Sequence, residues 1–239
     1  MKINRFEAAG LKCIEVAPAN AAGRDLPMFI CLHGRGDWGE SYVGLAQAIS
    51  ETGYRYIFPT APLALPGAYF EWFRLDSADI TKGARVTRTT VSNLVKELLE
   101  RFQTPASRTV LGGFSQGGMM TYEVGLRYPE KLAGLVVLSA LLLAEAPFNF
   151  MNPPDPATYY AGDKGDLKDV LAKAAADRLP VFIGHGTYDQ VVPVIAGRGA
   201  AQLLKQAGAP VEYYEFPGQH EITMAELHKI KGFLDQITS

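Results

Sequence analysis

Gly113-Phe114-Ser115-Gln116-Gly117 is the stretch that decides the fold of this 239-residue chain. It follows an apolar run, Thr109-Val110-Leu111, and precedes a segment with helical periodicity. A G-x-S-x-G pattern between a strand and a helix is typical of a sharp turn that lifts a serine hydroxyl out of the chain as a nucleophile. Such a turn lies close to neighbouring backbone, and Gly113 and Gly117 leave the room that it needs.

Strands and helices alternate on both sides of this turn. Short apolar runs predict buried strands at 27–32, 54–58, 108–112, 132–139, 180–183 and 211–216. Apolar spacing predicts helices at 41–51, around the stripe from Val91 to Phe102, at 116–127, at 194–207 and near the C-terminus. Residues 3–16 predict an antiparallel hairpin, and 60 to about 83 a Pro- and Gly-bearing loop. We therefore expect an α/β fold in a single domain, 1–239, with a mostly parallel central sheet and helices on both faces.

Residues 140–179 interrupt the alternation. Asn152-Pro153-Pro154-Asp155-Pro156 can continue neither a helix nor a central strand. We expect an irregular, cap-like insertion with a short helix near 167–177. Long irregular segments in compact domains often form lids or binding loops, so we expect 140–160 to cover a substrate pocket. Its wall would contain aromatic side chains: Phe148, Phe150 and one of Tyr159 and Tyr160.

The composition excludes several classes of partner. The formal net charge is −2 and no Lys/Arg block is present, so we expect no nucleic acid partner. No apolar run is long enough for a bilayer span or a secretory signal, so we expect no stable membrane insertion and a cytoplasmic location. Without such a signal, Cys13 and Cys31 are expected to be buried free thiols.

A serine hydroxyl needs a base to take its proton, and the base needs a carboxylate to orient it. Asp189 follows the predicted strand 180–183, and His220 follows the strand 211–216. Taken singly, Ser115 and Asp189 could each cap a helix, and His220 could be a capping or core histidine. Their order along the chain, each after its own strand, favours a catalytic triad. Other candidates for the acid are Asp163, Asp166 and Asp177.

The tetrahedral intermediate of such a reaction also needs main-chain N–H donors for its oxyanion. The Gln116 N–H, directly after the serine and at a helix N-terminus, is one expected donor. The second should come from His33-Gly34-Arg35-Gly36-Asp37, the loop after strand 27–32, and we choose the Arg35 N–H. We expect His33 to hold this loop by hydrogen bonds rather than to act as a second base.

The same loop carries a competing pattern, because Gly34-Arg35-Gly36-Asp37-Trp38-Gly39 matches G-x-G-x-x-G. A dinucleotide site also needs an acidic residue about 20 positions on to hold the ribose. Tyr56-Ile57-Phe58-Pro59-Thr60 contains none. No H-E-x-x-H or Cys/His cluster indicates a metal site. We therefore expect neither a cofactor nor a metal.

Four segments together resemble the phospholipase/carboxylesterase family of α/β-hydrolases, which includes the acyl-protein thioesterases. They are Leu32-His33-Gly34-Arg35-Gly36-Asp37, Gly113-Phe114-Ser115-Gln116-Gly117-Gly118, His185-Gly186-Thr187-Tyr188-Asp189-Gln190-Val191-Val192-Pro193 and Gly218-Gln219-His220. The resemblance implies an α/β-hydrolase fold, with Ser115, Asp189 and His220 as the triad. It also implies the Arg35 and Gln116 amides as the oxyanion hole. Trp72-Phe73 resembles the family's Trp-Phe pair in the loop that lines the acyl pocket, and plain packing of that loop is the alternative.

Two features depart from the family pattern. Arg35 stands where the family has a small or aliphatic residue, so its guanidinium either reaches the mouth and favours polar or anionic substrates or points to solvent. The insertion at 140–179 is longer than in the compact thioesterases.

From these observations we predict a serine carboxylesterase that acts on small-molecule esters with short- to medium-chain acyl groups. A thioesterase or lysophospholipase acting on longer acyl chains is the alternative among enzymes. A catalytically silent ligand-binding module is the alternative outside them. The sequence is compatible with a homodimer and does not predict one.

Overall fold

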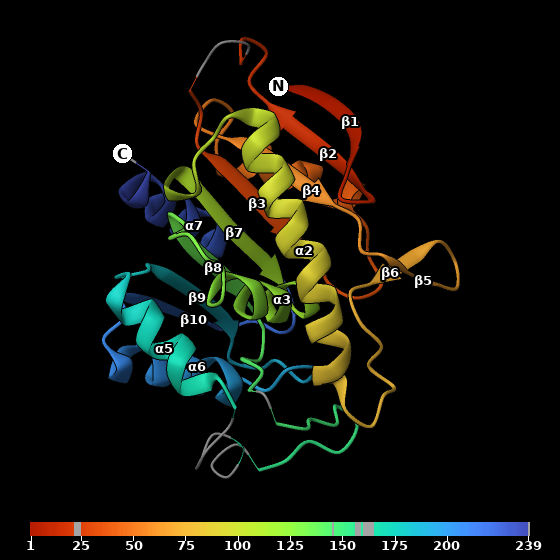
Figure 1. Ribbon diagram of the computed structural model, residues 1–239, viewed down its shortest axis with the longest axis vertical. Helices are drawn as coiled ribbons and strands as arrows, with labels where there is room; N and C mark the ends of the chain where they lie inside the picture. Colours follow the sequence, from red (N-terminus) through yellow and green to blue (C-terminus); the bar gives the residue numbers. More distant parts are fainter. Residues whose placement is uncertain (22–24, 145, 156–158, 160–164, 239) are drawn as a thin grey trace.

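The computed structural model describes residues 1–21, 25–144, 146–155, 159 and 165–238. The strands in this part of the chain are β1 Lys2–Ala8, β2 Leu11–Ala17, β3 Met28–Leu32, β4 Arg55–Pro59, β5 Leu63–Leu65, β6 Tyr69–Glu71, β7 Thr109–Phe114, β8 Gly134–Leu138, β9 Val181–Gly186 and β10 Val211–Phe216. The α-helices are α1 Val43–Ile49, α2 Ile80–Phe102, α3 Gln116–Gly125, α5 Leu167–Ala176, α6 Ile195–Ala207 and α7 Met224–Ile237, with 3₁₀ turns η1 Gly39–Tyr42 and η2 Ala106–Arg108. Figure 1 shows this arrangement.

The main sheet of the described chain has the order β1-β2-β4-β3-β7-β8-β9-β10. Every neighbouring pair from β4 to β10 is parallel, whereas β2 is antiparallel to both β1 and β4. Ala9 and Gly10, between β1 and β2, have φ of 48° and 75°, which suits a two-residue hairpin turn. The predicted mostly parallel sheet with an N-terminal hairpin is therefore confirmed.

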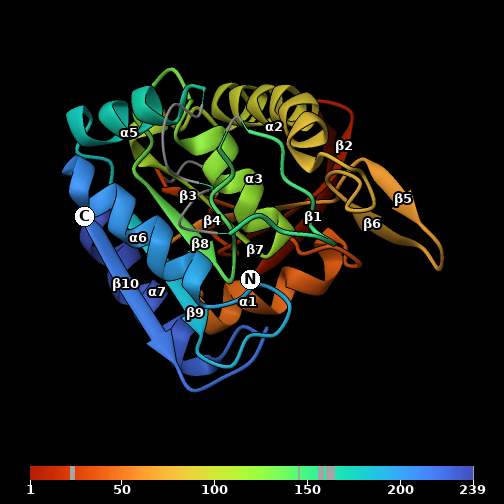
Figure 2. The ribbon, with the colours of Figure 1, turned by 90° about the horizontal axis from the view of Figure 1, so that it is seen from below.

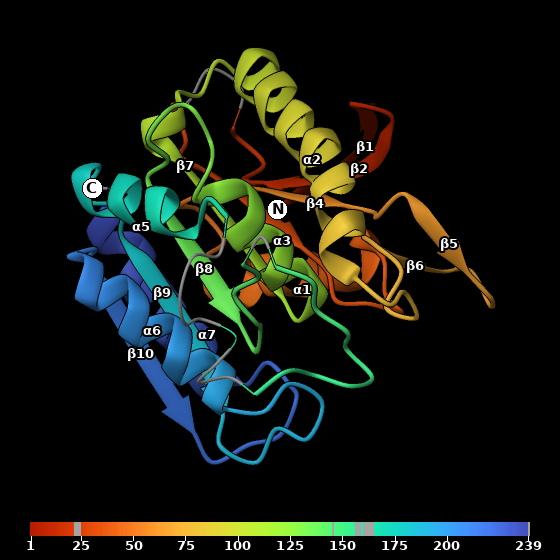
Figure 3. The same cartoon turned by 60° about the horizontal axis from the view of Figure 1, so that its bottom comes forward.

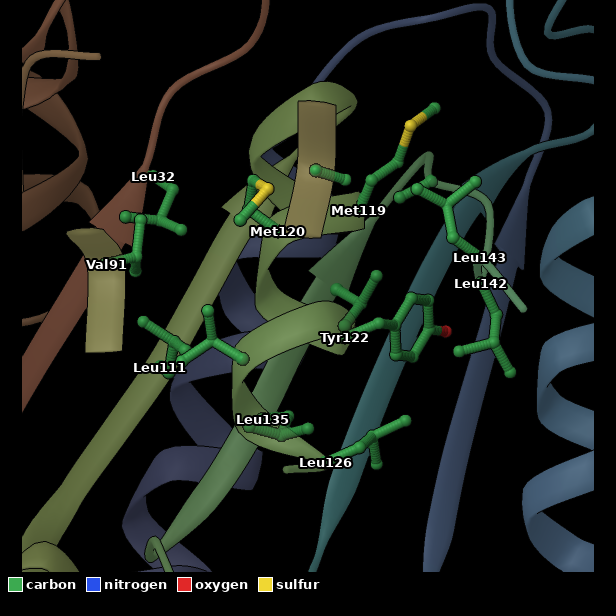
Figure 4. Packing of buried hydrophobic residues seen from close by; sticks show 14 of the residues in the cluster. Leu32, Val91, Leu111, Met119, Met120, Tyr122, Leu126, Leu135, Leu142 and Leu143 are labelled. Atoms are coloured by element: carbon green, nitrogen blue, oxygen red, sulfur yellow. The ribbon is translucent and has the colours of Figure 1, made fainter. Parts of the chain in front are cut away.

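Helices cover both faces of the sheet, as predicted (Figures 1 and 2). Side chains of α2, α3, α5 and α6 belong to one hydrophobic cluster, and those of α1 and α7 to a second cluster on the other face. Figure 4 shows Val91 of α2 beside Leu32 of β3, and Leu126, the residue directly after α3, beside Leu135 of β8. This packing fixes α3, and with it the turn that carries Ser115. None of the described helices is both long and apolar enough to cross a bilayer.

The prediction of a loop from 60 to about 83 is wrong. It contains the hairpin β5–β6, which projects from the body of the molecule (Figure 3), and α2 already begins at Ile80. Gly67 and Ala68 turn the hairpin with φ of 80° and 62°. The Asp79 side chain caps α2 by accepting from the Thr81 N–H at 3.1 Å. The predicted helix at 41–51 is also shorter, because η1 replaces its first turn.

The predicted insertion at 140–179 contains the expected short helix, α5. Phe148 and Tyr159 are both buried and meet edge to face, with ring centroids 5.1 Å apart. The Tyr159 hydroxyl accepts from the Ala144 N–H at 2.9 Å, and the Phe148 carbonyl accepts from the Ile80 N–H at 2.9 Å. This part of the segment therefore packs on the body of the protein. Tyr160 and Asp163 lie outside the described residues.

Candidate active site

Ser115 lies in a strained turn between β7 and α3. Its φ of 54° and ψ of −118° fall in a region that non-glycine residues rarely occupy, and such strain is common at functional sites. A side chain on Gly113 would come within 2.5 Å of the Gly117 carbonyl, and one on Gly117 within 2.2 Å of the Leu32 carbonyl oxygen. Both glycines are therefore required by close backbone approach, as the sequence predicted.

The structure brings Ser115, Asp189 and His220 together at the carboxyl edge of the sheet. His220 Nδ1 is 2.7 Å from Asp189 Oδ2, and His220 Nε2 is 2.8 Å from Ser115 Oγ. Because a carboxylate only accepts, Nδ1 carries the proton and donates it to Asp189. Nε2 is then the nitrogen that accepts from the serine hydroxyl. The imidazole has the tautomer that can take the serine proton.

Asp189 is held as an anion although it is only 6% exposed. Its Oδ1 accepts from the main-chain N–H groups of Val191 at 2.9 Å and Val192 at 2.8 Å. Burial raises the pKa of this carboxyl, but hydrogen bonds from two histidines and a main-chain amide outweigh burial. The pKa of Asp189 therefore lies well below its ordinary value. The two histidines are His185 and His220.

His185 is a residue to which the sequence analysis assigned no role. It is fully buried, and its Nε2 lies 2.8 Å from the Val192 carbonyl oxygen and 3.5 Å from Asp189 Oδ2. The one Nε2–H is shared between the carbonyl and, at the longer distance, the carboxylate, and so fixes the loop that supplies the acid. His185 stands four positions before Asp189 in the segment His185 to Pro193, and this spacing is the sequence feature that could have indicated its role.

The other candidate acids pair with cations elsewhere. Asp166 accepts two hydrogen bonds of 2.6 Å from Arg127, and Asp177 pairs with Lys173. Asp189 is therefore the described candidate that lies against His220.

The loop after β3 approaches Ser115 from the neighbouring strand. A side chain on Gly34 would lie 3.0 Å from the Phe114 ring and 3.6 Å from Ser115 Cβ. His33 is buried, and both of its ring nitrogens bond to backbone: Nδ1 to the Gly34 carbonyl at 2.7 Å, and Nε2 to the Ala61 N–H at 2.9 Å. The predicted structural role of His33 is confirmed, and the loop places Arg35 next to the serine.

Residues 70–73 bind both segments that would supply the oxyanion donors. The Gly36 N–H donates to the Phe70 carbonyl at 2.9 Å, which fixes the loop of Arg35. The Gln116 side chain accepts from the Trp72 N–H at 2.7 Å and donates to the Phe73 carbonyl at 2.6 Å. The Gln116 main-chain N–H is the first in α3, and the first four N–H groups of a helix have no acceptor within it. Such a donor is available to an oxyanion.

Trp72 and Phe73 are fully buried and line neither the cavity that contains Ser115 nor the apolar cavity that adjoins it. The Trp72 indole N–H donates to the His33 carbonyl at 2.8 Å, and its ring lies 5.3 Å from the imidazole of His33. Their observed contacts are those of packing, the alternative considered for Trp72. They position the residues around the serine.

Two cavities adjoin at the candidate site, and Ser115 lines one of them. The first, which we call the mouth, has a volume of about 400 Å³, and its walls include Arg35, Asp76, Ser115, Phe150, Val191 and His220. The second, the apolar cavity, has a volume of about 330 Å³, and its walls include Phe148, Phe150, Tyr159, Val191 and Ile195. Phe150 and Val191 belong to both, so the apolar cavity adjoins the mouth at these two side chains. A long apolar group can lie there while a polar group remains in the mouth.

Comparison with known proteins gives one family. A family model described as phospholipase/carboxylesterase matches residues 13–154 and 167–238. The gap between the two matched ranges, residues 155–166, falls inside the predicted insertion at 140–179.

Individual relatives agree with this match. Acyl-protein thioesterase 1 of Neurospora crassa is 30% identical over 240 residues, which cover 90% of this chain and 89% of the relative. Acyl-protein thioesterase 1 of Gibberella zeae is 29% identical, with 90% and 92% covered. The crystal structure of esterase PE8 is 26% identical, covers 99% of this chain and 100% of its own, and superposes with a TM-score of 0.75.

Proposed function

The chain belongs to the phospholipase/carboxylesterase family of α/β-hydrolases, a family of serine esterases and thioesterases, and we propose that it is a serine carboxylesterase acting on small esters with short- to medium-chain acyl groups. One observation carries the proposal: Asp189, His220 and the strained Ser115 form a continuous hydrogen-bonded chain, and Ser115 lines a cavity that adjoins a second, apolar one.

The proposed reaction has two halves, acylation of Ser115 and hydrolysis of the acyl-enzyme, and the triad acts in both. His220 Nε2 takes the Ser115 proton while Oγ attacks the ester carbonyl. The Arg35 and Gln116 main-chain N–H groups hold the oxyanion of the tetrahedral intermediate. His220 then gives its proton to the leaving alcohol, and water repeats the sequence on the acyl-enzyme. Asp189 orients the imidazole and stabilises its protonated form.

The apolar cavity supports a preference for acyl groups of limited length. Its volume is about 330 Å³. A methylene group fills about as much space as one water molecule, roughly 30 Å³, so a close-packed chain of about ten carbons would fill it. Phe148 and Tyr159 close part of its wall, which fits the proposed cap over the acyl group.

A thioesterase or lysophospholipase acting on longer chains is the second candidate, because the relatives from Gibberella zeae and Neurospora crassa are named acyl-protein thioesterase 1. The same triad would attack a thioester carbonyl. The two proposals differ in acyl length and in the leaving group.

Hydrolysis of p-nitrophenyl esters from acetate to palmitate tests the proposal. We expect kcat/KM to peak at short or medium chains, and Ser115→Ala to lower kcat by roughly 10⁴-fold or more because triad residues act as a unit. Phe150→Ala should shift the peak to longer chains, whereas Val86→Ala, an exposed change on α2, should leave it in place. A wild-type peak at palmitate would favour the second candidate, and near wild-type turnover by Ser115→Ala would refute both.

A further inference from the structure

The mouth has two kinds of wall. Phe150 and Val191 mark the side where it joins the apolar cavity. Arg35 and Asp76 line only the mouth, so they bound the part that does not continue into the apolar cavity. With the acyl group in the apolar cavity, the alcohol part of an ester would face these charged side chains.

Arg35 is held in place by a buried carboxylate. Its Nε donates to Glu71 Oε2 at 2.8 Å, and Arg74 Nη1 donates to Glu71 Oε1 at 2.7 Å. Glu71 is 1% exposed, while the Arg35 side chain is 46% exposed. One carboxylate therefore serves two guanidinium groups, and the three side chains together carry one net positive charge.

The free edge of this guanidinium is available to a ligand. In the part of the chain that the structure describes, Nε is the atom of Arg35 that bonds to protein, and its two Nη groups have no protein acceptor there. Glu71 ends β6, and β6 is tied to the loop of Arg35 through Phe70. An arginine fixed in this way loses little conformational freedom when it binds an anion.

We propose that Arg35 determines specificity by binding a carboxylate on the alcohol part of the ester. The inference rests on the proposed function, which places the acyl group in the apolar cavity. A guanidinium presents paired N–H groups that match the two oxygens of a carboxylate. A phosphate monoester fits less well, because it carries a charge of about −1.5 to −2 and the carboxylate of Asp76 lines the same cavity.

Asp76 gives the proposal an internal control. It is exposed and lines the mouth together with Arg35, so its negative charge opposes the binding of an anion there. Removal of either side chain's charge should therefore change the preference for anionic esters, in opposite directions.

The test compares two butyrate esters that differ in one group: the ester of 4-hydroxybenzoate and the ester of 4-hydroxybenzamide. The readout is the ratio of their kcat/KM values, which cancels any general effect of a substitution on folding or on the oxyanion hole. Arg35→Gln should lower the ratio by roughly tenfold, the loss expected for a charge-assisted hydrogen bond. Arg35→Lys should restore part of it, because the charge remains without the paired geometry.

Asp76→Asn should raise the ratio by roughly two- to threefold, and added salt should lower the wild-type ratio because both groups are partly solvated. If Arg35→Gln does not fold, the Asp76→Asn and salt measurements still show whether charge in the mouth sets the ratio of kcat/KM values. A ratio unchanged by Asp76→Asn and by salt overturns the proposal, as does an unchanged ratio in Arg35→Gln.

Hydrolysis of the benzamide ester by wild-type protein separates a wrong assignment of Arg35 from a wrong proposed function. A wild-type protein that hydrolyses the benzamide ester, but whose ratio responds to none of these changes, is an esterase without the proposed anion preference. A wild-type protein that hydrolyses neither ester removes the proposed function and this inference together.

Discussion

Asp189 shows how single residues set the chemistry of this site. A carboxylate that is 6% exposed stays ionised because two main-chain amides and two histidines stabilise its charge. The charge in turn selects the tautomer of His220 that can accept the Ser115 proton. The residue is therefore proposed to act through His220 rather than on the substrate.

Asp189→Asn should leave the shape of the site unchanged and still remove most activity. The amide cannot hold the imidazole in the required tautomer, and a loss in kcat of roughly 10⁴-fold is expected. The measurement is kcat for p-nitrophenyl butyrate. Asp177→Asn, which alters a carboxylate paired with Lys173, is the matched control and should keep wild-type kcat. Equal activity of Asp189→Asn and wild type would exclude Asp189 as the orienting acid.

Sequence reasoning found Ser115, Asp189 and His220 because each follows a strand, and parallel strands end at one edge of a sheet. It did not find His185 or Glu71. Both act through contacts with residues that no local pattern identifies: His185 through the Val192 carbonyl, and Glu71 through Arg35, 36 positions earlier in the chain.

The hairpin β5–β6 is the element that local patterns could not predict. Its strands have three residues each, too short for a periodic signal, and its Gly and Pro content is typical of a loop. Its register is set by long-range contacts, since Phe70 bonds to Gly36 and the chain directly after it bonds to Gln116. The hairpin therefore fixes both segments that carry the proposed oxyanion donors through contacts that no local sequence pattern predicts.

Longer elements were predictable because their patterns are strong. The stripe from Val91 to Phe102 predicted the second half of α2, and the apolar runs predicted every parallel strand of the sheet. The start of α2 was missed because residues 80–90 carry little apolar periodicity, and the cap at Asp79 defines it instead.

At the scale of the whole molecule, one sheet carries two hydrophobic layers and the candidate site at its carboxyl edge. We propose that the chain folds as a single domain, because both layers share this sheet. Glu226, at the start of α7, lies in the second layer. It is fully buried, with Oε1 1.9 Å from the place where a side chain on Gly184 would begin. Burial raises the pKa of Glu226 to about 8.

This carboxyl predicts how global stability depends on pH. Below its ordinary pKa of 4.5, Glu226 is protonated in both the folded and the unfolded chain. Between pH 4.5 and about 8, Glu226 is ionised in the unfolded chain and protonated in the folded one. The free energy of unfolding therefore falls by about 1.4 kcal/mol per pH unit relative to a variant that does not titrate. Above a pH of about 8, Glu226 is ionised in both states, and the difference in free energy of unfolding between the two proteins becomes constant.

Glu226→Gln is that variant, because its amide is neutral at every pH. Urea unfolding of both proteins at several pH values, followed by circular dichroism and by tryptophan fluorescence, measures the difference. We expect Glu226→Gln to gain stability over wild type as pH rises through this window, with both signals following one transition. A constant difference between the two proteins would show that Glu226 ionises normally in the folded state.

Covalent labelling by a fluorophosphonate tests the central claim most directly, because the reagent reacts with an activated serine and not with an ordinary hydroxyl. Intact mass and peptide mapping should show one adduct, on Ser115, formed rapidly by wild type and far more slowly by His220→Ala. An unlabelled Ser115 in folded wild-type protein, or labelling that does not depend on His220, would contradict the proposal that these residues form a working nucleophile.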